Sequence, residues 1–410
     1  MPSSEGIDSG ANPGDRRAEL GTAQYRRALV ALFCAGLAVF VQLYSPQGLL
    51  PDIARDFGVT AGTSSWAVGA ATIGVAIGVL PWAMLSDRIG RVRAMRWAVM
   101  SGVGVGLLLP LAPDFGVMVG IRLIEGLALA GIPAVGLTAL AETVSPRALG
   151  IAVGTYISGN TIGGLSGRII AALAAEPFGW RLGLLAVSLL AALAALGFTL
   201  FVPRTAIAPK RVPAMRALLV NLRAPGVMVS VVQAFLLMGG FVSAYNYLTF
   251  RLQQDPFELT LSQVSWIFLA YLAGAAASRW AWQLVPRLSP NLVLLFGIAV
   301  MLVGLALTLL PSLIAVFAGL ALFTAGFFGA HSIASGLAQR RSVEARSLVA
   351  PLYNLGFYAG SSLLGWAGGL AFAAGGWGGT AAMIAAVALL AAASAWRYAA
   401  SRGGLRVADS

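Results

Sequence analysis

Long runs of apolar residues, each about twenty residues long, alternate with short polar segments along the whole chain. A helix needs about 20 apolar residues to cross a hydrocarbon core of about 30 Å. Lipid offers no partner for free backbone N–H and C=O groups, so each run should be helical. We therefore expect an all-α integral membrane protein with twelve transmembrane helices. The expected helices cover residues 28–48, 63–85, 94–112, 115–138, 149–173, 180–202, 226–249, 262–284, 290–310, 313–337, 346–372 and 378–398.

Composition and charge agree with a membrane protein. Hydrophobic residues make up 59% of the chain and charged residues 10%, against about 25% charged residues in soluble domains. With the N-terminus placed inside, 22 of the 27 basic residues fall in cytoplasmic segments. Arg55, Arg181 and Arg251 fall outside, and Arg122 and Arg168 lie within helices. This asymmetry predicts a multi-pass protein of the cytoplasmic (inner) membrane with both termini in the cytoplasm. It also explains the net charge of +12 without a nucleic-acid partner.

Polar segments divide the chain into five parts. Residues 1–27 lack the apolar core of a signal peptide, and we expect a disordered cytoplasmic tail there. A half of six helices, 28–202, is followed by a cytoplasmic linker, 203–225. A second half of six helices, 226–398, precedes a short cytoplasmic tail, 399–410.

The two halves repeat each other. Tyr156, Gly159, Gly163, Gly179 and Trp180 recur as Tyr353, Gly356, Gly360, Gly376 and Trp377 at a constant offset of 197 residues. The fifth expected helix thus corresponds to the eleventh. Parallel repeats related by an axis along the membrane normal are one architecture of secondary transporters.

Several motifs then point to a known family. The loop after the second helix reads D-R-x-G-R from Asp87 to Arg91, and the fourth helix carries R-x-x-x-G from Arg122 to Gly126. With the six-plus-six topology, these motifs resemble the major facilitator superfamily. The segments YISGNTIGGLSGR (156–168), FFGAHSIASG (327–336) and YAGSS (358–362) are similar to the YnfM-type group of bacterial inner-membrane exporters, which is related to drug:proton antiporters. The resemblance implies a secondary active transporter that works by alternating access, with proton-coupled export of a small solute.

The D-R-x-G-R loop is a candidate gate. A carboxylate in this loop can cap the N-terminus of a neighbouring helix, where unpaired N–H groups attract anions. The resemblance implies that Asp87 meets the start of the eleventh helix near Ser347, and that Arg91 meets Glu142. The expected gate residues are Asp87, Arg88, Gly90, Arg91 and Glu142. The alternative is a solvated turn that only obeys the charge rule for cytoplasmic loops.

Three charged residues lie within the expected helices. Glu125 follows Arg122 at i+3 on the same helical face, and Arg168 lies at a similar depth in the fifth helix. A charge at the bilayer centre costs about 2.5 kcal/mol or more, so such residues usually face a cavity or a partner. We expect Glu125 and Arg122 to couple protons. The balance of +1 favours anionic or carboxylate-bearing substrates, since arginine pairs well with carboxylate. A structural salt bridge between helices is the alternative.

Polar side chains in other helices are further candidates for the substrate cavity. The expected cavity residues are Gln42, Tyr44, Arg168, Tyr245, Asn246 and His331. Tyr245 and Asn246, with Tyr247, could instead belong to the aromatic belt at the membrane surface. His331 could move protons or be a hydrogen-bonded packing residue.

Glycines concentrate in the fifth helix and recur in the eleventh. The expected helix-packing residues are Gly159, Gly163, Gly164, Gly167, Gly356 and Gly360, because glycine lets helices approach closely. A smooth seam along which the halves slide would need the same residues.

Other classes of protein fit the sequence poorly. One histidine, one cysteine and no paired carboxylates inside the helices argue against an enzyme, and no phosphate-binding loop of an ATP-driven pump is present. We expect no cofactor and no metal. The expected partners are a small-molecule substrate, protons and the lipid bilayer, with a monomeric chain. An importer or exchanger of organic anions on the same fold remains an alternative to an exporter, and a non-transport membrane receptor is a remote one.

Overall fold

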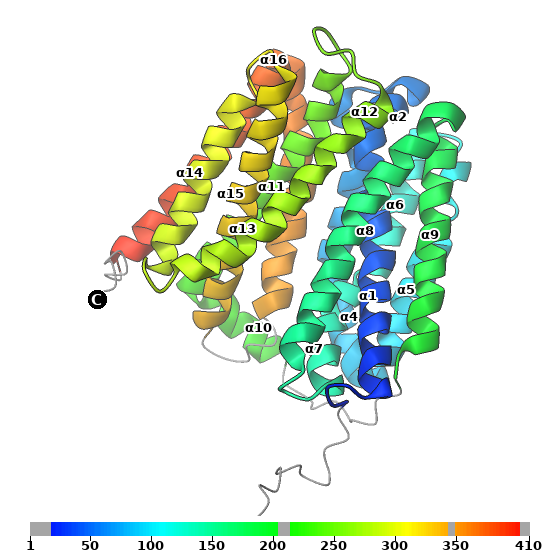
Figure 1. Cartoon of the computed structure of the whole chain (residues 1–410), viewed down its shortest axis with the longest axis vertical. Helices are drawn as coiled ribbons and strands as arrows, with labels where there is room; N and C mark the ends of the chain where they lie inside the picture. Colours follow the sequence, from blue (N-terminus) through cyan, green and yellow to red (C-terminus); the bar gives the residue numbers. More distant parts are fainter. Residues whose placement is uncertain (1–17, 204–213, 343–348, 402–410) are drawn as a thin grey trace, which may run out of the picture.

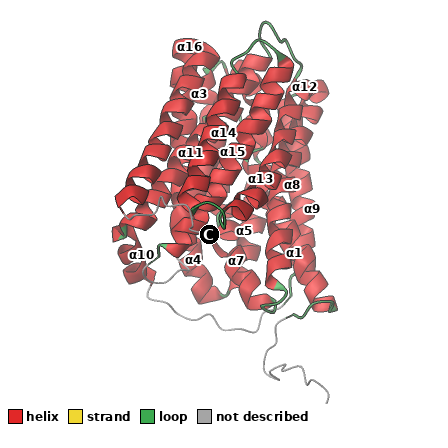
Figure 2. Ribbon diagram, turned by 60° about the vertical axis from the view of Figure 1, so that its left-hand side comes forward, coloured by secondary structure: helices red, strands yellow, loops and turns green. Residues whose placement is uncertain are grey.

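The computed structural model describes residues 18–203, 214–342 and 349–401, and this part of the chain is almost entirely helical (Figure 1, Figure 2). Ten helical segments within it are long and apolar enough to cross a membrane. The last of them, α16 (Val349–Ser401), contains non-helical backbone at Gly375 and Gly376 and is therefore two spans. A further helix of 30 residues, α8 (Leu149–Phe178), is less apolar because it is rich in glycine and also contains Asn160 and Arg168. Counting both, the described residues form the twelve expected spans.

The helices fall into two halves, each with six spans. The first half contains α1 (Ala23–Leu43), η1 (Ser45–Leu49), α2 (Leu50–Phe57), α3 (Ala61–Ser64), α4 (Trp66–Ile89), α5 (Arg91–Gly106), η2 (Leu109–Leu111), α6 (Phe115–Leu129), α7 (Gly131–Thr143), α8 and α9 (Trp180–Phe201). The second contains α11 (Pro225–Leu252), α12 (Leu261–Ser265), η3 (Trp266–Leu269), α13 (Ala270–Leu284), α14 (Pro290–Leu307), α15 (Leu313–Arg340) and α16. The linker between them contains the short helix α10 (Ala214–Arg223).

Some boundaries differ from the expected ones. The first helix begins at Ala23 rather than at residue 28, because the side chain of Thr22 accepts a hydrogen bond from the backbone of Tyr25 and caps the helix. Ala18 pairs with the backbone of Thr143. The last helix continues to Ser401. The rest of the expected tails and part of the linker lie outside the described residues.

The halves stand side by side with their helices roughly parallel (Figure 1). One end of the bundle carries the start of α1 and the linker helix α10, and we call it the linker end. The opposite end, called the far end, carries α2 and α12. The halves meet mainly where α16 packs on α3 and α4, and where α12 packs on α8.

Glycines form the tightest turns between spans. Gly90 separates α4 from α5 with φ of +91°, and Gly179 separates α8 from α9 with φ of +83°. Gly376, the repeat counterpart of Gly179, has φ of +56° within α16. Only glycine adopts these angles without a steric penalty, so the chain reverses at these positions without a loop.

Helix packing in the first half follows the predicted glycine face of α8. A Cβ atom on Gly159 would lie 2.4 Å from the Phe33 carbonyl oxygen, and one on Gly167 would lie 2.2 Å from that of Val41. Gly163 approaches Leu37 of α1 in the same way. Gly164 differs, because a Cβ there would meet only the Arg168 guanidinium, at 3.3 Å. It therefore lies beside Arg168 rather than at a helix contact.

The second half repeats this packing with one reversal. Gly356 and Gly360 of α16 lie against the carbonyl oxygens of Val231 and Phe235 of α11. One turn further on, the counterpart of Gly167 is Leu364, and it packs on Gly239, where a Cβ would lie 2.4 Å from the Leu364 Cβ. In the first half the glycine lies on α8 and its larger partner, Val41, on α1. In the second half the glycine lies on α11 and its larger partner, Leu364, on α16.

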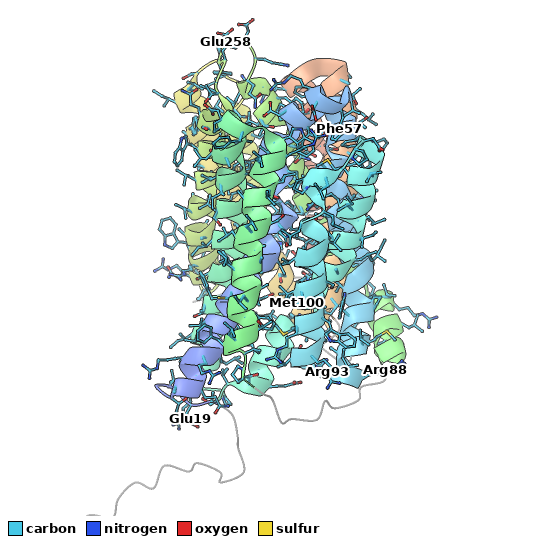
Figure 3. The ribbon with its side chains drawn as sticks, turned by 90° about the vertical axis from the view of Figure 1, so that its right-hand side faces the viewer. Glu19, Phe57, Arg88, Arg93, Met100 and Glu258 are labelled. Carbon is cyan, nitrogen blue, oxygen red and sulfur yellow. The ribbon has the colours of Figure 1, made fainter. Side chains whose placement is uncertain are left out.

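The surface of the bundle suits a bilayer. Large apolar side chains such as Ile314, Leu193 and Trp280 are 83%, 67% and 65% exposed. Figure 3 shows Arg88 and Arg93 at the linker end, with Met100, which is exposed, above them. The protein is thus a multi-pass membrane protein, and lipid covers this apolar surface.

Candidate functional site

A cavity of about 290 Å³ lies between the two halves, close to the smallest volume usual for small-molecule sites, about 300 Å³. Its walls come from α1, α7 and α8 in the first half and from α11, α13, α15 and α16 in the second. The aromatic lining residues are Phe40, Tyr44, Tyr156, Phe241, Tyr271, Phe327, Phe328, Phe357 and Tyr358. The polar ones are Asn160, Thr161, Arg168, His331 and Asn354. The described lining therefore has one permanent positive charge and no carboxylate.

Arg168 holds that charge in a neutral setting. The side chain is 2% exposed. Its Nε donates to Oε1 of Gln47 at 2.7 Å, Nη1 donates to the Gly164 carbonyl oxygen at 2.6 Å, and Nη2 donates to the Tyr271 hydroxyl at 3.0 Å. The described residues place no carboxylate within 4.0 Å of it.

Aromatic rings surround the guanidinium group. Its central carbon lies 4.8 Å from the ring centroids of Tyr44 and Tyr271 and 5.1 Å from that of Phe268. Such contacts contribute about 2 kcal/mol or more each when they are desolvated. They hold the cation in place but supply no counter-charge.

Gln47 connects Arg168 to the opposite half. Its Nε2 donates to Oδ1 of Asn246 in α11 at 2.7 Å. Nearer the far end, Glu176 of α8 accepts a hydrogen bond from the backbone N–H of Ser262 in α12 at 2.6 Å. These bonds join the halves on the far side of Arg168, whereas the cavity extends from Arg168 toward the linker end, along α8 to Tyr156 and along α16 to Asn354.

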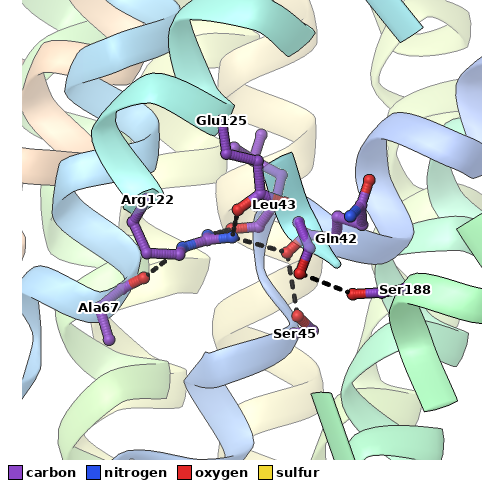
Figure 4. A network of polar contacts seen from close by, with 8 residues as sticks. Gln42, Leu43, Ser45, Ala67, Arg122, Glu125 and Ser188 are labelled. Carbon is purple, nitrogen blue, oxygen red and sulfur yellow. Dashed lines mark hydrogen bonds and ion pairs between the residues drawn. The ribbon is translucent and has the colours of Figure 1, made fainter. Parts of the chain in front are cut away.

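The predicted Arg122–Glu125 pair forms a second polar site, away from the cavity lining (Figure 4). Nη1 of Arg122 lies 2.7 Å from Oε2 of Glu125, and both side chains are at most 1% exposed. Arg122 also donates from Nε to the Ala67 carbonyl oxygen at 2.6 Å, and to the carbonyl oxygens of Gln42 and Leu43.

These hydrogen bonds also give Arg122 a structural role at the end of α1. The last carbonyl groups of a helix have no partner within the helix, and α1 ends at Leu43. Arg122 satisfies the two carbonyl groups at this end and ties α1 to α4 and α6 (Figure 4). Glu125 is the only buried carboxylate among the described residues.

The structure separates the six expected cavity residues into two sets. Tyr44, Arg168 and His331 line the cavity. Gln42 does not: it is 2% exposed, lies against Gly106 beside Glu125, and its side-chain amide has no hydrogen-bond partner. Tyr245 and Asn246 do not line the cavity either. Asn246 accepts a hydrogen bond from Gln47, and the Tyr245 ring centroid lies 5.1 Å from that of Tyr271.

The alternative of an aromatic belt for α11 does not fit the structure. Tyr245 and Tyr247 are both 0% exposed. The Tyr245 hydroxyl shares a hydrogen bond of 2.7 Å with Thr324, and Tyr247 donates to the Gly365 carbonyl oxygen at 2.7 Å. Both rings therefore pack inside the second half, away from lipid.

His331 lines the cavity and is also hydrogen-bonded. Its Nδ1 and the Tyr353 hydroxyl share a hydrogen bond of 2.9 Å, and its ring stacks on Phe327 with centroids 5.5 Å apart. A cavity role and a packing role thus occur together.

The residues expected to form a gate lie at the linker end. Nη1 of Arg91 lies 2.6 Å from Oδ1 of Asp87, and Nε lies 3.5 Å from Oε1 of Glu142. The contact that the resemblance implied between Arg91 and Glu142 is therefore present. Ser347, the implied partner of Asp87, lies outside the described residues.

Two residues that the sequence did not single out complete the site. Gln47 bonds both Arg168 and Asn246, and Tyr271 bonds Arg168. A glutamine between apolar helices was a usable signal for Gln47. Tyr271 had no such signal, because a tyrosine in an apolar run is ordinary.

Comparisons with known proteins agree with this architecture. Residues 29–365 match the Major Facilitator Superfamily. The chain is 36% identical to the inner membrane transport protein YnfM of Escherichia coli over 381 residues, which cover 90% of each chain. It is 32% identical to the MFS-type transporter YybF of Bacillus subtilis, over 90% of this chain and 93% of that one.

Solved structures share the fold. A bacterial homologue of the human lysosomal transporter Spinster, in an inward-facing and unoccupied conformation, superposes with a TM-score of 0.76 at 16% identity, over 94% of this chain and 98% of that one. The family and the structural neighbours are transporters rather than enzymes. The described fold, the paired halves and these relatives together place the chain in the Major Facilitator Superfamily of membrane transporters.

Proposed function

We propose that this protein is a secondary active transporter that exports a small organic solute from the cytoplasm in exchange for protons. The observation that carries the proposal is the cavity between the halves, which is lined by the buried cation Arg168. The charge asymmetry of the sequence assigns the linker end to the cytoplasm. Hydrogen bonds from Gln47 to Asn246 and from Ser262 to Glu176 join the two halves between Arg168 and the far end. With the halves joined there, we infer that the cavity loads a solute from the linker end, as export requires.

One family relative supports export in particular. The chain is 30% identical over 231 residues to a chloramphenicol resistance protein of Streptomyces lividans, covering 54% of this chain and 56% of that one. A transporter gives resistance when it lowers the internal concentration of a compound. Export by this chain is consistent with that relationship.

Glu125 is the proposed proton carrier. It is a buried carboxylate with one arginine partner, at 2.7 Å. A carrier must be reached in both protonation states during the cycle, so the pair has to separate in one conformation. Arg122 bonds backbone groups of α1 and α4, so a movement of these helices would change its distance from Glu125.

A purely structural Arg122–Glu125 pair is the second candidate, and it rests on the three carbonyl groups that Arg122 also satisfies. Transport in proteoliposomes under an imposed pH gradient separates the two. With Glu125→Gln, we expect loss of pH-driven accumulation and retention of counterflow at uniform pH. Glu258→Gln, at the far end, is the matched control and should behave as wild type. Full pH coupling in Glu125→Gln would leave the pair with its structural role alone.

The direction of solute transport needs a separate measurement. Inverted membrane vesicles that accumulate a solute when acidified inside would show export coupled to protons. Uptake of organic anions by right-side-out vesicles would instead support the importer or exchanger on the same fold.

A further inference from the structure

We propose that the cavity binds a compact organic monocarboxylate with a flat, aromatic body, and that Arg168 holds its carboxylate group. This inference rests on the proposed function, since it names the class of solute that the transporter carries. Three observations support the inference: the hydrogen-bond partners of Arg168, the net charge of the cavity lining, and the aromatic side chains of the cavity walls.

The first step concerns hydrogen bonds. A guanidinium group has five N–H donors, and the bonds to Gln47, Gly164 and Tyr271 use three of them, one from each nitrogen. Nη1 and Nη2 each keep a further N–H. Arg168 lines the cavity. A carboxylate in the cavity can accept from both of these atoms, which is the paired geometry that arginine favours.

The second step concerns charge. A buried charge without a counter-ion is costly, and the described lining offers no acid to Arg168. A monoanion compensates this charge completely. A second negative group would have no cation within the described lining, and an ammonium group would be repelled by Arg168 and would leave the buried charge uncompensated. The site therefore favours one negative charge over two, and either over a positive charge.

The third step concerns shape. Aromatic rings from both halves line the space next to Arg168, including Tyr44, Tyr156, Phe241, Phe327 and Phe357. Phe241 and Phe327 already stack on each other with centroids 4.0 Å apart and planes 16° apart. A flat ring can stack against aromatic side chains of this lining, and a volume of about 290 Å³ suits a body of one or two fused rings.

The structure offers a sharp substitution for testing the site. Gln47→Glu replaces an amide with a carboxylate of the same shape at 2.7 Å from Nε of Arg168. The new side chain supplies a permanent internal anion. It should abolish the preference for an anionic ligand without removing Arg168 or altering the volume of the cavity.

The experiment measures equilibrium binding to the purified protein in detergent at uniform pH. The probes are 2-naphthoate, its neutral isostere 2-naphthamide, and 2,6-naphthalenedicarboxylate. We expect 2-naphthoate to bind wild type at least about tenfold more tightly than either other probe, a factor that corresponds to about 1.4 kcal/mol. Gln47→Glu and Arg168→Gln should each weaken 2-naphthoate binding at least about tenfold, while Arg168→Lys should lie between. Arg55→Gln, which removes an arginine that is 71% exposed, is the matched control and should bind as wild type.

Each contrary result overturns the inference. Equal affinity for 2-naphthoate and 2-naphthamide would show that the charge is not recognised, and so would wild-type affinity in Gln47→Glu. Absence of 2-naphthoate binding at millimolar concentration would exclude the class of ligand. Size-exclusion profiles and thermal melting of each variant identify loss of folding, and Gln47→Glu keeps the test valid if Arg168→Gln does not fold. No pH gradient is used, so failure here leaves proton-coupled transport of another solute intact.

Discussion

Gln47 and Asn246 form a hydrogen bond of 2.7 Å between the two halves, and the same side chain of Gln47 accepts a hydrogen bond from Arg168. One amide group therefore takes part both in a contact between the halves and in the proposed substrate site. A ligand that draws Arg168 toward the cavity acts on a residue that also holds the halves together. Binding and the change of conformation can be coupled through this contact.

The first prediction concerns this bond. Asn246→Leu removes the acceptor for Gln47 and should favour opening of the far end, because a neutral hydrogen bond contributes about 1 kcal/mol. A cysteine introduced at Ser262, in a background with Cys34→Ser, should then react about fivefold faster with an impermeant thiol reagent from the far side. Asn291→Leu, in α14 of the same half, provides a comparison. Equal labelling rates in Asn246→Leu and the parent would show that the bond does not hold the far end closed.

The second prediction concerns Asp87. Asp87→Asn removes the charge that pairs with Arg91 at 2.6 Å. If the gate proposed from the family resemblance operates, transport should slow strongly while substrate binding is retained, and cysteine accessibility should shift toward the inward-facing state. Arg93→Gln, near the start of α5, changes the charge at the same end but leaves the Asp87–Arg91 pair in place, and it is the control for a change in local charge. Normal transport with unchanged accessibility on both sides would support a solvated turn.

The third prediction separates stability from coupling at the buried ion pair. Arg122→Gln leaves Glu125 without its partner and releases carbonyl groups at the end of α1. Removing one partner of a buried pair costs about 3–5 kcal/mol, so we expect a large fall in the melting temperature measured in detergent. Glu125→Gln should lower it less, since the amide oxygen can still accept from Arg122. Equal destabilisation by both variants would contradict the capping role of Arg122.

The fourth prediction uses the reversed packing of the repeats. Gly167→Leu should destabilise the first half, because the added side chain meets the backbone of Val41 and overpacking costs about 1–3 kcal/mol. The double variant Gly167→Leu with Val41→Gly copies the arrangement of Leu364 and Gly239 and should recover part of the loss. Thermal melting of the two single variants and the double variant gives the interaction energy. An additive result would mean that the two positions do not compensate each other.

The sequence predicted much of this fold because lipid restricts the alternatives. Spans, the repeat and the packing role of Gly159, Gly163, Gly167, Gly356 and Gly360 followed from periodicity and residue size, and the structure agrees. Arg122 and Glu125 were recognisable as partners from their spacing of three residues on one helix.

Other parts of the site depend on contacts that spacing along the chain does not encode. The rotation of α11 about its axis brings Asn246 within hydrogen-bond distance of Gln47. The end of helix α1 before η1 makes Arg122 a partner of backbone carbonyl groups. Tyr271 meets Arg168 from the other half, a relation over 103 residues. Such contacts require the docking of the halves and could not be read from one helix at a time.

The exchange of Gly167 and Val41 for Leu364 and Gly239 has a consequence for how the two halves arose and diverged. If an ancestral six-helix unit was duplicated, each copy has since acquired its own pair of complementary residues at this helix contact. A hybrid that set α1 against the second copy of α8 would bring Val41 onto Leu364, and the reciprocal hybrid would place Gly239 opposite Gly167 and leave a void. Helices that occupy equivalent places in the two copies are therefore no longer interchangeable parts.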